Sequence, residues 1–215
     1  MKTLKVLAGI IFISGLILPG VVQSQGTGTQ LTYTRSFPLA GVAERFTPFN
    51  TADVSIYFQT NNALDILAHL EYSQLNQVNT EDLYYDDISM NLLVWGASVD
   101  WVYPLTESKL KPYVGGGVGL YRWDFERDEY SIPDTTVAAD TAVFKTIKPL
   151  ERGEAAWGLN AIGGIEYKIA GGLAIDVNVR YKIVLASLWP TLRLHLESVD
   201  GLQFVNVNAG IRYYW

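Results

Sequence analysis

The sequence predicts an all-β fold, an eight-stranded antiparallel up-and-down transmembrane β-barrel with short periplasmic turns and long extracellular loops. Three observations predict it. The last segment, 202–215, alternates apolar and polar residues throughout and stops on aromatic residues. Further alternating segments precede it, and short and long connections alternate between them. No later segment offers the roughly 20 consecutive apolar residues that a membrane-spanning helix needs.

The amino-terminal residues 1–24 have the features of a secretory signal peptide. Lys2 and Lys5 precede an apolar run that ends at Leu18, and small residues follow it. A basic start, a short apolar run and small residues near the cut are what the export machinery recognises. We therefore expect residues 25–215 to form the barrel domain, located in the cell outer membrane.

The composition excludes several classes of protein. The chain has 16 Lys plus Arg against 22 Asp plus Glu and no basic cluster, which argues against a nucleic acid as partner. It has no cysteine, which excludes a disulfide framework and thiolate metal sites. Thirteen tyrosines and six tryptophans suit an interfacial aromatic belt.

Eight strands are predicted, each with one apolar and one polar face. The first carries one exception, Arg35, on its apolar face. In the most regular, Asp176, Asn178 and Arg180 alternate with apolar residues. The eight strands are 29–37, 52–60, 64–73, 88–103, 111–125, 157–169, 173–183 and 202–215.

The fourth strand has two halves whose apolar residues are out of phase. Met90 and Leu92 would face outward at its start, but Trp95 and Trp101 would face outward later. One extra residue would restore the register. We therefore predict a β-bulge near Leu92–Leu93.

The fifth strand carries a ladder of inward glycines at Gly115, Gly117 and Gly119. Glycine weakens a strand, so the ladder needs a physical reason. We expect these glycines to let a small barrel curve tightly and to make room for a large neighbour such as an aromatic or arginine side chain.

The connections sort into two classes. Tight turns are expected at 61–62, 106–109 and 170–172, and long loops at 38–51, 74–87, 126–155 and 184–201. This alternation is typical of a barrel with periplasmic turns and outward loops. The structural alternative is a soluble calycin-type barrel, which would bury the apolar face around a ligand.

Several segments resemble small outer-membrane β-barrels of the OmpA-like and OmpX-like family, also described as porin family proteins. They are Phe37–Gly41, Ala43–Phe46, Lys111–Leu120, Gly163–Tyr167 and Gly210–Tyr213. The resemblance covers about Leu31 to Trp215 and implies an outer-membrane barrel. Because no peptidoglycan-binding domain follows the last strand, a cell-wall tether is not expected.

The carboxyl terminus also resembles the assembly signal of bacterial outer-membrane barrels. That signal places a polar residue and a glycine before two alternating aromatics, here Asn208, Gly210, Tyr213 and Trp215. The resemblance implies that the outer-membrane insertion machinery recognises these residues. Outer-membrane lipid and lipopolysaccharide are the other expected partners, and a monomer is expected.

The inward faces predict a charged lumen. An eight-stranded barrel is only wide enough for side chains to fill, and buried charges must be paired. We therefore favour a salt-bridged plug with a structural or surface-interaction role. A small passive pore for ions or solutes is the alternative. The predicted lumen residues are Asp65, His69, Glu71, Asp100, Glu166, Lys168, Asp176, Arg180, Lys182 and Arg212.

A lipid A-modifying enzyme is the second alternative. His69, Glu71 and Ser73 follow one another on an inward face, and His195, Glu197 and Ser198 lie in the last long loop. Neighbouring inward residues of one strand are about 6 to 7 Å apart, beyond direct hydrogen-bond reach. We therefore assign no catalytic residue, no cofactor-binding residue and no metal ligand, and we expect no enzyme activity.

The longest loop is acidic. A run of acidic residues in a loop is usually a solvated surface. It could also bind calcium between the loops and lipopolysaccharide phosphates. No spacing resembles an EF-hand. The acidic residues are Glu126, Asp128, Glu129, Asp134, Asp140, Glu151 and Glu154.

Overall fold

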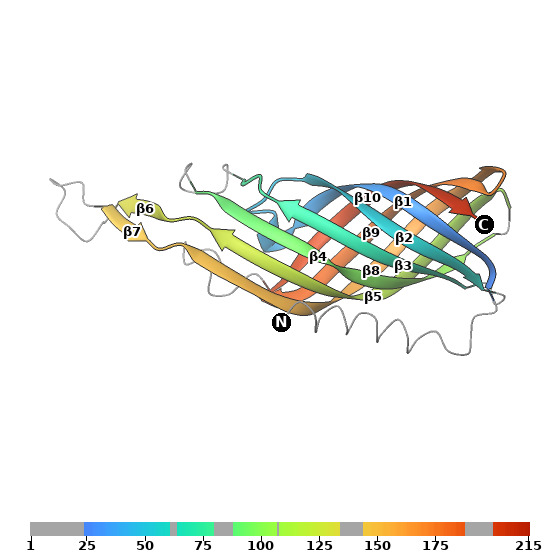
Figure 1. Ribbon diagram of the computed structural model, residues 1–215. Helices are drawn as coiled ribbons and strands as arrows, with labels where there is room; N and C mark the ends of the chain where they lie inside the picture. Colours follow the sequence, from blue (N-terminus) through green and yellow to red (C-terminus); the bar gives the residue numbers. More distant parts are fainter. Residues whose placement is uncertain (1–23, 61–63, 80–87, 107, 134–143, 188–199) are drawn as a thin grey trace.

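Eight antiparallel strands close into a barrel in the computed structural model (Figure 1). The structure describes residues 24–60, 64–79, 88–106, 108–133, 144–187 and 200–215. Around the barrel the strand order is β1-β10-β9-β8-β5-β4-β3-β2. The bounds are β1 Ser24–Leu39, β2 Phe49–Thr60, β3 Asp65–Leu75, β4 Met90–Pro104, β5 Leu110–Arg127, β8 Leu150–Ala170, β9 Leu173–Ser187 and β10 Asp200–Tyr214.

The barrel has a turn end and a loop end. The β8–β9 turn is at Gly171–Gly172, where both glycines have positive φ, and the β4–β5 connection lies at the same end. At the loop end, β6 Tyr130–Pro133 and β7 Phe144–Ile147 form a hairpin that projects from β5 and β8 (Figure 1). The hairpin lies within the range 126–155, for which the sequence predicted a long loop. Residues 1–23, which include nearly all of the predicted signal peptide, lie outside the described residues.

The apolar faces of the strands point outward, as predicted. In β10, Ile211 and Tyr213 are 60% and 53% exposed, whereas Arg212 between them is 2% exposed. Arg35 lies on the outer wall, where it donates to Asn50 Oδ1 at 2.9 Å. An apolar exterior around a polar interior is the arrangement of a membrane barrel. The calycin-type alternative, with its apolar face buried around a ligand, is therefore wrong.

The predicted β-bulge in β4 is also wrong. The strand keeps one continuous register with β3 and with β5 along its whole length. Met90 and Leu92 face the interior, at 2% and 0% exposure, and Leu93 faces outward. The two halves looked out of phase because the interior itself is apolar at the loop end, so apolar residues there do not mark the lipid face.

Of the three predicted ladder glycines, only Gly119 makes room for an aromatic ring. A Cβ on Gly117 would instead meet the Asp100 carboxylate, and one on Gly115 would meet the backbone carbonyl of Trp101. A Cβ on Gly119 or on Gly158 of the neighbouring strand would lie 2.5 Å from Cε2 of Tyr121. A Cβ on Gly164 would lie 2.7 Å from Tyr113 Cζ. Two large rings therefore fill the barrel where its wall lacks side chains.

The helical content of the described chain is a single turn, η1 Ala40–Val42, in the loop after β1. Within the part of the chain that the structure describes, no helix is long and apolar enough to cross a membrane.

Candidate functional site: the barrel interior

The interior divides into two regions, which we call the charged network and the apolar cap. The charged network occupies the turn end and the middle of the lumen, and the apolar cap fills the loop end. Six carboxylates face four Lys and Arg side chains and one histidine in the charged network. Its members are Asp53, Asp65, His69, Glu71, Asp100, Lys111, Glu166, Asp176, Arg180, Lys182 and Arg212.

The middle of the charged network is organised around Arg180 of β9. Its Nη1 lies 3.2 Å from Glu71 Oε1 and its Nη2 lies 3.1 Å from Asp100 Oδ2. Lys182 Nζ neutralises the other oxygen of Glu71 at 2.7 Å. His69 completes the group, with Nε2 3.2 Å from Asp100 Oδ2. Because β3, β4 and β9 all contribute, this group joins opposite walls of the barrel.

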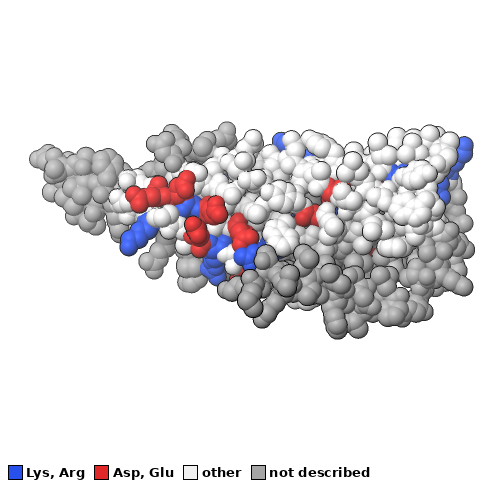
Figure 2. All heavy atoms as spheres, viewed as in Figure 1, with Lys and Arg blue, Asp and Glu red and all other residues white. Residues whose placement is uncertain are grey.

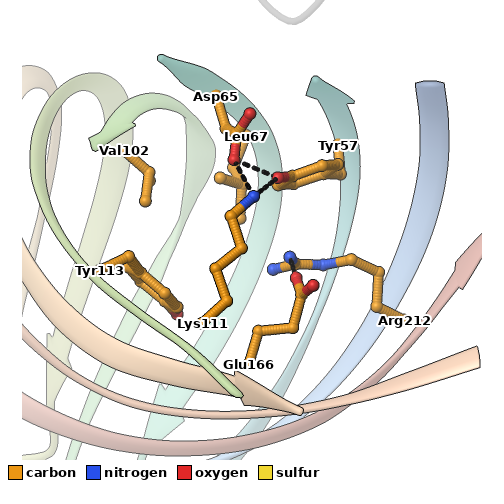
Figure 3. A pocket seen from close by; sticks show the side chains of 8 residues that line it. All are labelled: Tyr57, Asp65, Leu67, Val102, Lys111, Tyr113, Glu166 and Arg212. Carbon is orange, nitrogen blue, oxygen red and sulfur yellow. Dashed lines mark hydrogen bonds and ion pairs between the residues drawn. The ribbon is translucent and has the colours of Figure 1, made fainter. Parts of the chain in front are cut away.

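The turn end of the charged network surrounds a cavity of about 10 Å³. Figure 3 shows Lys111 reaching Asp65, at 2.7 Å, and Tyr57 on one side of it, while Arg212 meets Glu166 on the other. A cavity of this size holds about one water molecule. Glu166 Oε1 has no hydrogen-bond partner among the described residues, so a water in this cavity would satisfy it.

The apolar cap lies at the loop end. Its centre is Trp123, fully buried, and Phe49 and Phe204 meet edge to face at 6.0 Å between ring centroids. Lys182 Nζ lies 5.2 Å from the Tyr121 ring centroid and so marks the boundary with the charged network. The buried members are Val42, Phe46, Phe49, Leu75, Ile88, Met90, Leu92, Val94, Tyr121, Trp123, Phe125, Tyr130, Ala156, Val184, Ala186, Leu202 and Phe204.

Comparison with known proteins agrees with this architecture. A family model described as the Opacity family porin protein matches residues 61–214. The chain belongs to this Opacity porin family. No curated protein matches it. The earlier resemblance to small outer-membrane barrels is thereby confirmed, and the barrel is a bacterial outer-membrane protein.

Three solved structures are similar to this Opacity-family barrel. Neisserial surface protein A has 16% identity and a TM-score of 0.51, with 88% of this chain and 97% of that chain covered. A major outer membrane protein from Thermus thermophilus has 9% identity and a TM-score of 0.54, covering 88% and 99%. Ail of Yersinia pestis, in complex with the heparin analogue sucrose octasulfate, has 10% identity and a TM-score of 0.50, covering 88% and 99%. At these identities the likeness shows the fold alone.

Nine of the ten predicted lumen residues are buried inside the Opacity-family barrel, and Lys168 is not. Lys168 is exposed near the β8–β9 turn, where its Nζ lies 5.7 Å from the Tyr214 ring centroid. A register shift between Lys168 and Ala170 turns the strand there. Asp53 and Lys111 were missed, although extending the alternation by one step from Ser55 and from Tyr113 places both inward.

The predicted hydrolytic groups are not assembled. His69 pairs with Asp100, and Glu71 accepts a hydrogen bond from Ser98 Oγ at 3.2 Å. Among the described residues, Ser73 is buried without a hydrogen bond to His69 or Glu71. The second group, His195, Glu197 and Ser198, lies outside the described residues. The predicted group of His69, Glu71 and Ser73 therefore does not form a hydrogen-bonded nucleophile and base.

The described part of the acidic loop is largely paired strand. We call Arg122–Arg127 of β5 and Leu150–Trp157 of β8 the β5–β8 arm. Figure 2 shows charged side chains gathered at this end of the molecule and a largely uncharged wall elsewhere. Within the described part, no group of three His, Cys, Asp or Glu residues could hold a metal ion. Asp134 and Asp140 lie outside that part.

The loop after β1 is tied to the loop after β3. Phe46 and Val78 form an isolated antiparallel bridge, and Asn79 N donates to Arg45 O at 2.8 Å. Arg45 is 1% exposed and its Nη1 donates to Gly41 O, so burial lowers the pKa of its guanidinium. A groove of about 360 Å³ runs beside the bridge, lined by Phe37, Pro38, Ala43, Phe46, Thr47, Pro48, Val78 and Asn79.

Proposed function

We propose that this protein is a closed outer-membrane barrel that supports and presents a surface at its loop end, outside the cell. The observation that carries this proposal is that buried side chains occupy the lumen in two regions, and we infer that together they close it. The charged network fills one part with paired side chains, and the apolar cap fills the rest. The loop end, with its bridged loops and the β5–β8 arm, is then the part available to partners.

Both closures oppose conduction for physical reasons. An ion needs continuous water, and the cavity within the charged network has room for about one water molecule. Opening the network would separate buried ion pairs, and breaking such a pair costs about 3–5 kcal/mol. The apolar cap excludes hydrated ions altogether. A passive pore is therefore the weaker candidate.

Conductance of the folded protein in a planar bilayer tests the closed lumen. Folding is first confirmed by the shift in gel mobility on heating. We expect no discrete current steps from the wild type. Reproducible steps that change in Arg180→Ala or Glu166→Gln would overturn the closed-lumen proposal and favour a small pore.

The carboxyl-terminal strand is proposed to guide assembly. Tyr213 and Trp215 are more than half exposed on the outer wall, whereas Asn208 and Gly210 are buried. We expect deletion of Trp215 to lower the folded yield in the outer membrane strongly, because an exposed aromatic can be read by the insertion machinery. Val207→Ala, on the same face, is the matched control. Equal yields of the two variants would contradict this role. In its own membrane the barrel is expected to be a monomer in contact with lipid and lipopolysaccharide.

The proposal includes no enzyme activity. It rests on two observations. The predicted hydrolytic residues do not meet, and His69 and Glu71 each pair with other residues, His69 with Asp100 and Glu71 with Arg180 and Lys182. Incubation of the purified protein with lipid A in micelles should leave the lipid unchanged. Deacylation that stops in His69→Ala would refute this part of the proposal.

A further inference from the structure

At the loop end, one edge of the β8 strand is paired with no described strand. Its stretch Leu150–Trp157 pairs with β5 on one side. On the other side β9 joins β8 only from Gly158, opposite Val184, and no backbone hydrogen bond from a described residue reaches Leu150–Trp157. Figure 1 shows β5 and β8 extending beyond the neighbouring strands at this end. Such an edge presents N–H and C=O groups that another strand can pair with. We call this stretch the β8 edge.

A second β8 edge can pair with the first in only a few registers. In an antiparallel ladder, alternate residues direct their N–H and C=O groups toward the partner strand. Two identical edges turn the N–H and C=O groups of the same alternate residues toward each other. A residue of one copy can therefore oppose only the same residue of the other copy, or a residue an even number of positions away from it. The possible antiparallel registers are therefore each centred on one residue, which faces its own copy.

Charge distinguishes the four registers that are centred on residues 151 to 154. Centring on Glu151, Arg152 or Glu154 places two identical charges directly opposite each other, which is destabilising. Centring on Gly153 instead places Arg152 opposite Glu154, and symmetry repeats this pair. Arg152 is half-exposed and Glu154 is exposed, so both are available. Charges on an edge strand usually prevent pairing. Here they prevent it in three registers and favour it in a fourth.

The antiparallel direction fixes how the two barrels lie. In every copy β8 runs from the loop end to the turn end. Strands of outer-membrane barrels tilt by about 35–45° from the membrane normal, so two β8 strands in one membrane cross at roughly 90° at most. Antiparallel pairing requires about 180°. The two copies must therefore meet loop end to loop end, from two facing membranes.

We propose that the β8 edge is a homotypic contact, which pairs with the β8 edge of a second copy about Gly153 and joins two facing outer membranes. This inference rests on the proposed surface role and names its partner. One contact is short and therefore weak on its own. Many copies on two facing surfaces act together, and multivalency raises the overall strength without new contacts.

Charge exchange in detergent micelles tests the contact. We expect folded wild-type protein to self-associate in sedimentation experiments as its concentration rises. Arg152→Glu and Glu154→Arg should each weaken self-association about tenfold or more, because attractive pairs become repulsive. An equimolar mixture of the two variants should restore it, since the new carboxylate of one copy would then face the new guanidinium of the other. Lys148→Glu and Glu129→Arg, exposed positions outside the β8 edge, are the matched controls.

A cysteine experiment tests the register. The chain has no cysteine of its own, and the Gly153-centred register places Glu151 opposite Ala155. A mixture of Glu151→Cys and Ala155→Cys proteins should form a disulfide dimer, and neither variant alone should form one to the same extent. A wild type that stays monomeric, or a charge-exchanged mixture that does not recover, would overturn the proposal. Conductance of the same preparations reports separately on the closed lumen.

Discussion

The charged network and the apolar cap fill the same barrel by opposite physical means. The charged network satisfies each buried charge with specific partners, as when Glu71 receives Lys182 on one oxygen and Arg180 on the other. The apolar cap is stabilised by side chains that fit together and fill the available volume, as around Trp123. A buried ion pair becomes costly when one partner is lost, whereas an apolar contact is lost in proportion to the volume removed. The two regions should therefore respond differently to single substitutions.

The largest effect is expected in the charged network. Arg180→Ala removes the partner of both Glu71 and Asp100 and should lower the free energy of unfolding by about 3–5 kcal/mol. Urea unfolding in micelles, followed by tryptophan fluorescence, measures it. Arg122→Ala is the control, because its pair with Asp124 at 2.6 Å is only about two-thirds buried and on the outer wall. A similar loss in both variants would remove the distinction between buried and exposed pairs.

A core truncation in the apolar cap should come next. Leu92→Ala leaves a cavity beside Trp123 and should lower the free energy of unfolding by about 2–4 kcal/mol. Leu31→Ala, at a lipid-facing position that is 62% exposed, is the control and should lose much less. Equal losses of unfolding free energy in the two variants would show that a leucine facing lipid contributes as much to stability as a leucine in the apolar cap.

The boundary between the two regions gives an intermediate test. Gly119→Ala places a Cβ 2.5 Å from the Tyr121 ring and should cost about 1–3 kcal/mol through overpacking. Gly163→Ala has no neighbour closer than 3.9 Å and should be nearly neutral or slightly stabilising. Gly119→Ala as stable as the wild type would mean that Tyr121 can move away without cost.

The smallest effect is a difference in salt dependence. The Arg122–Asp124 pair is partly exposed, and an exposed pair contributes about 0–1 kcal/mol that salt screens. The pairs of Arg180 are buried and much less screened. The loss in Arg122→Ala should therefore shrink between low and high salt, while the loss in Arg180→Ala should persist. Thermal unfolding at two salt concentrations measures both.

The sequence was sufficient to predict the barrel because period-two alternation assigns faces strand by strand. It placed Asp176, Arg180 and Arg212 inward correctly, because polar residues alternate with lipid-facing ones there. It failed where that contrast disappears. Met90 and Leu92 face the apolar cap, and an apolar interior beside an apolar exterior carries no alternation to read.

Long-range contacts were also beyond the sequence. Val42 and Phe46 come from a segment expected to be a long outward loop, yet they belong to the apolar cap together with strands far along the chain. The cationic partners of Glu71 lie on β9, more than a hundred residues away. Alternation predicts that both charges face inward, but only closure of the barrel decides which charges meet.

The packing of Tyr121 has an evolutionary consequence. Its ring occupies the space of side chains missing at Gly96, Gly119 and Gly158, which belong to three adjacent strands. None of these glycines can gain a side chain first without meeting the ring. A smaller residue in place of the tyrosine would free the space beside Gly158, whereas a Cβ on Gly96 would still meet the backbone carbonyl of Leu120 and one on Gly119 would still meet Ser98. In related chains Tyr121 and Gly158 should therefore change together, with the tyrosine replaced before the glycine.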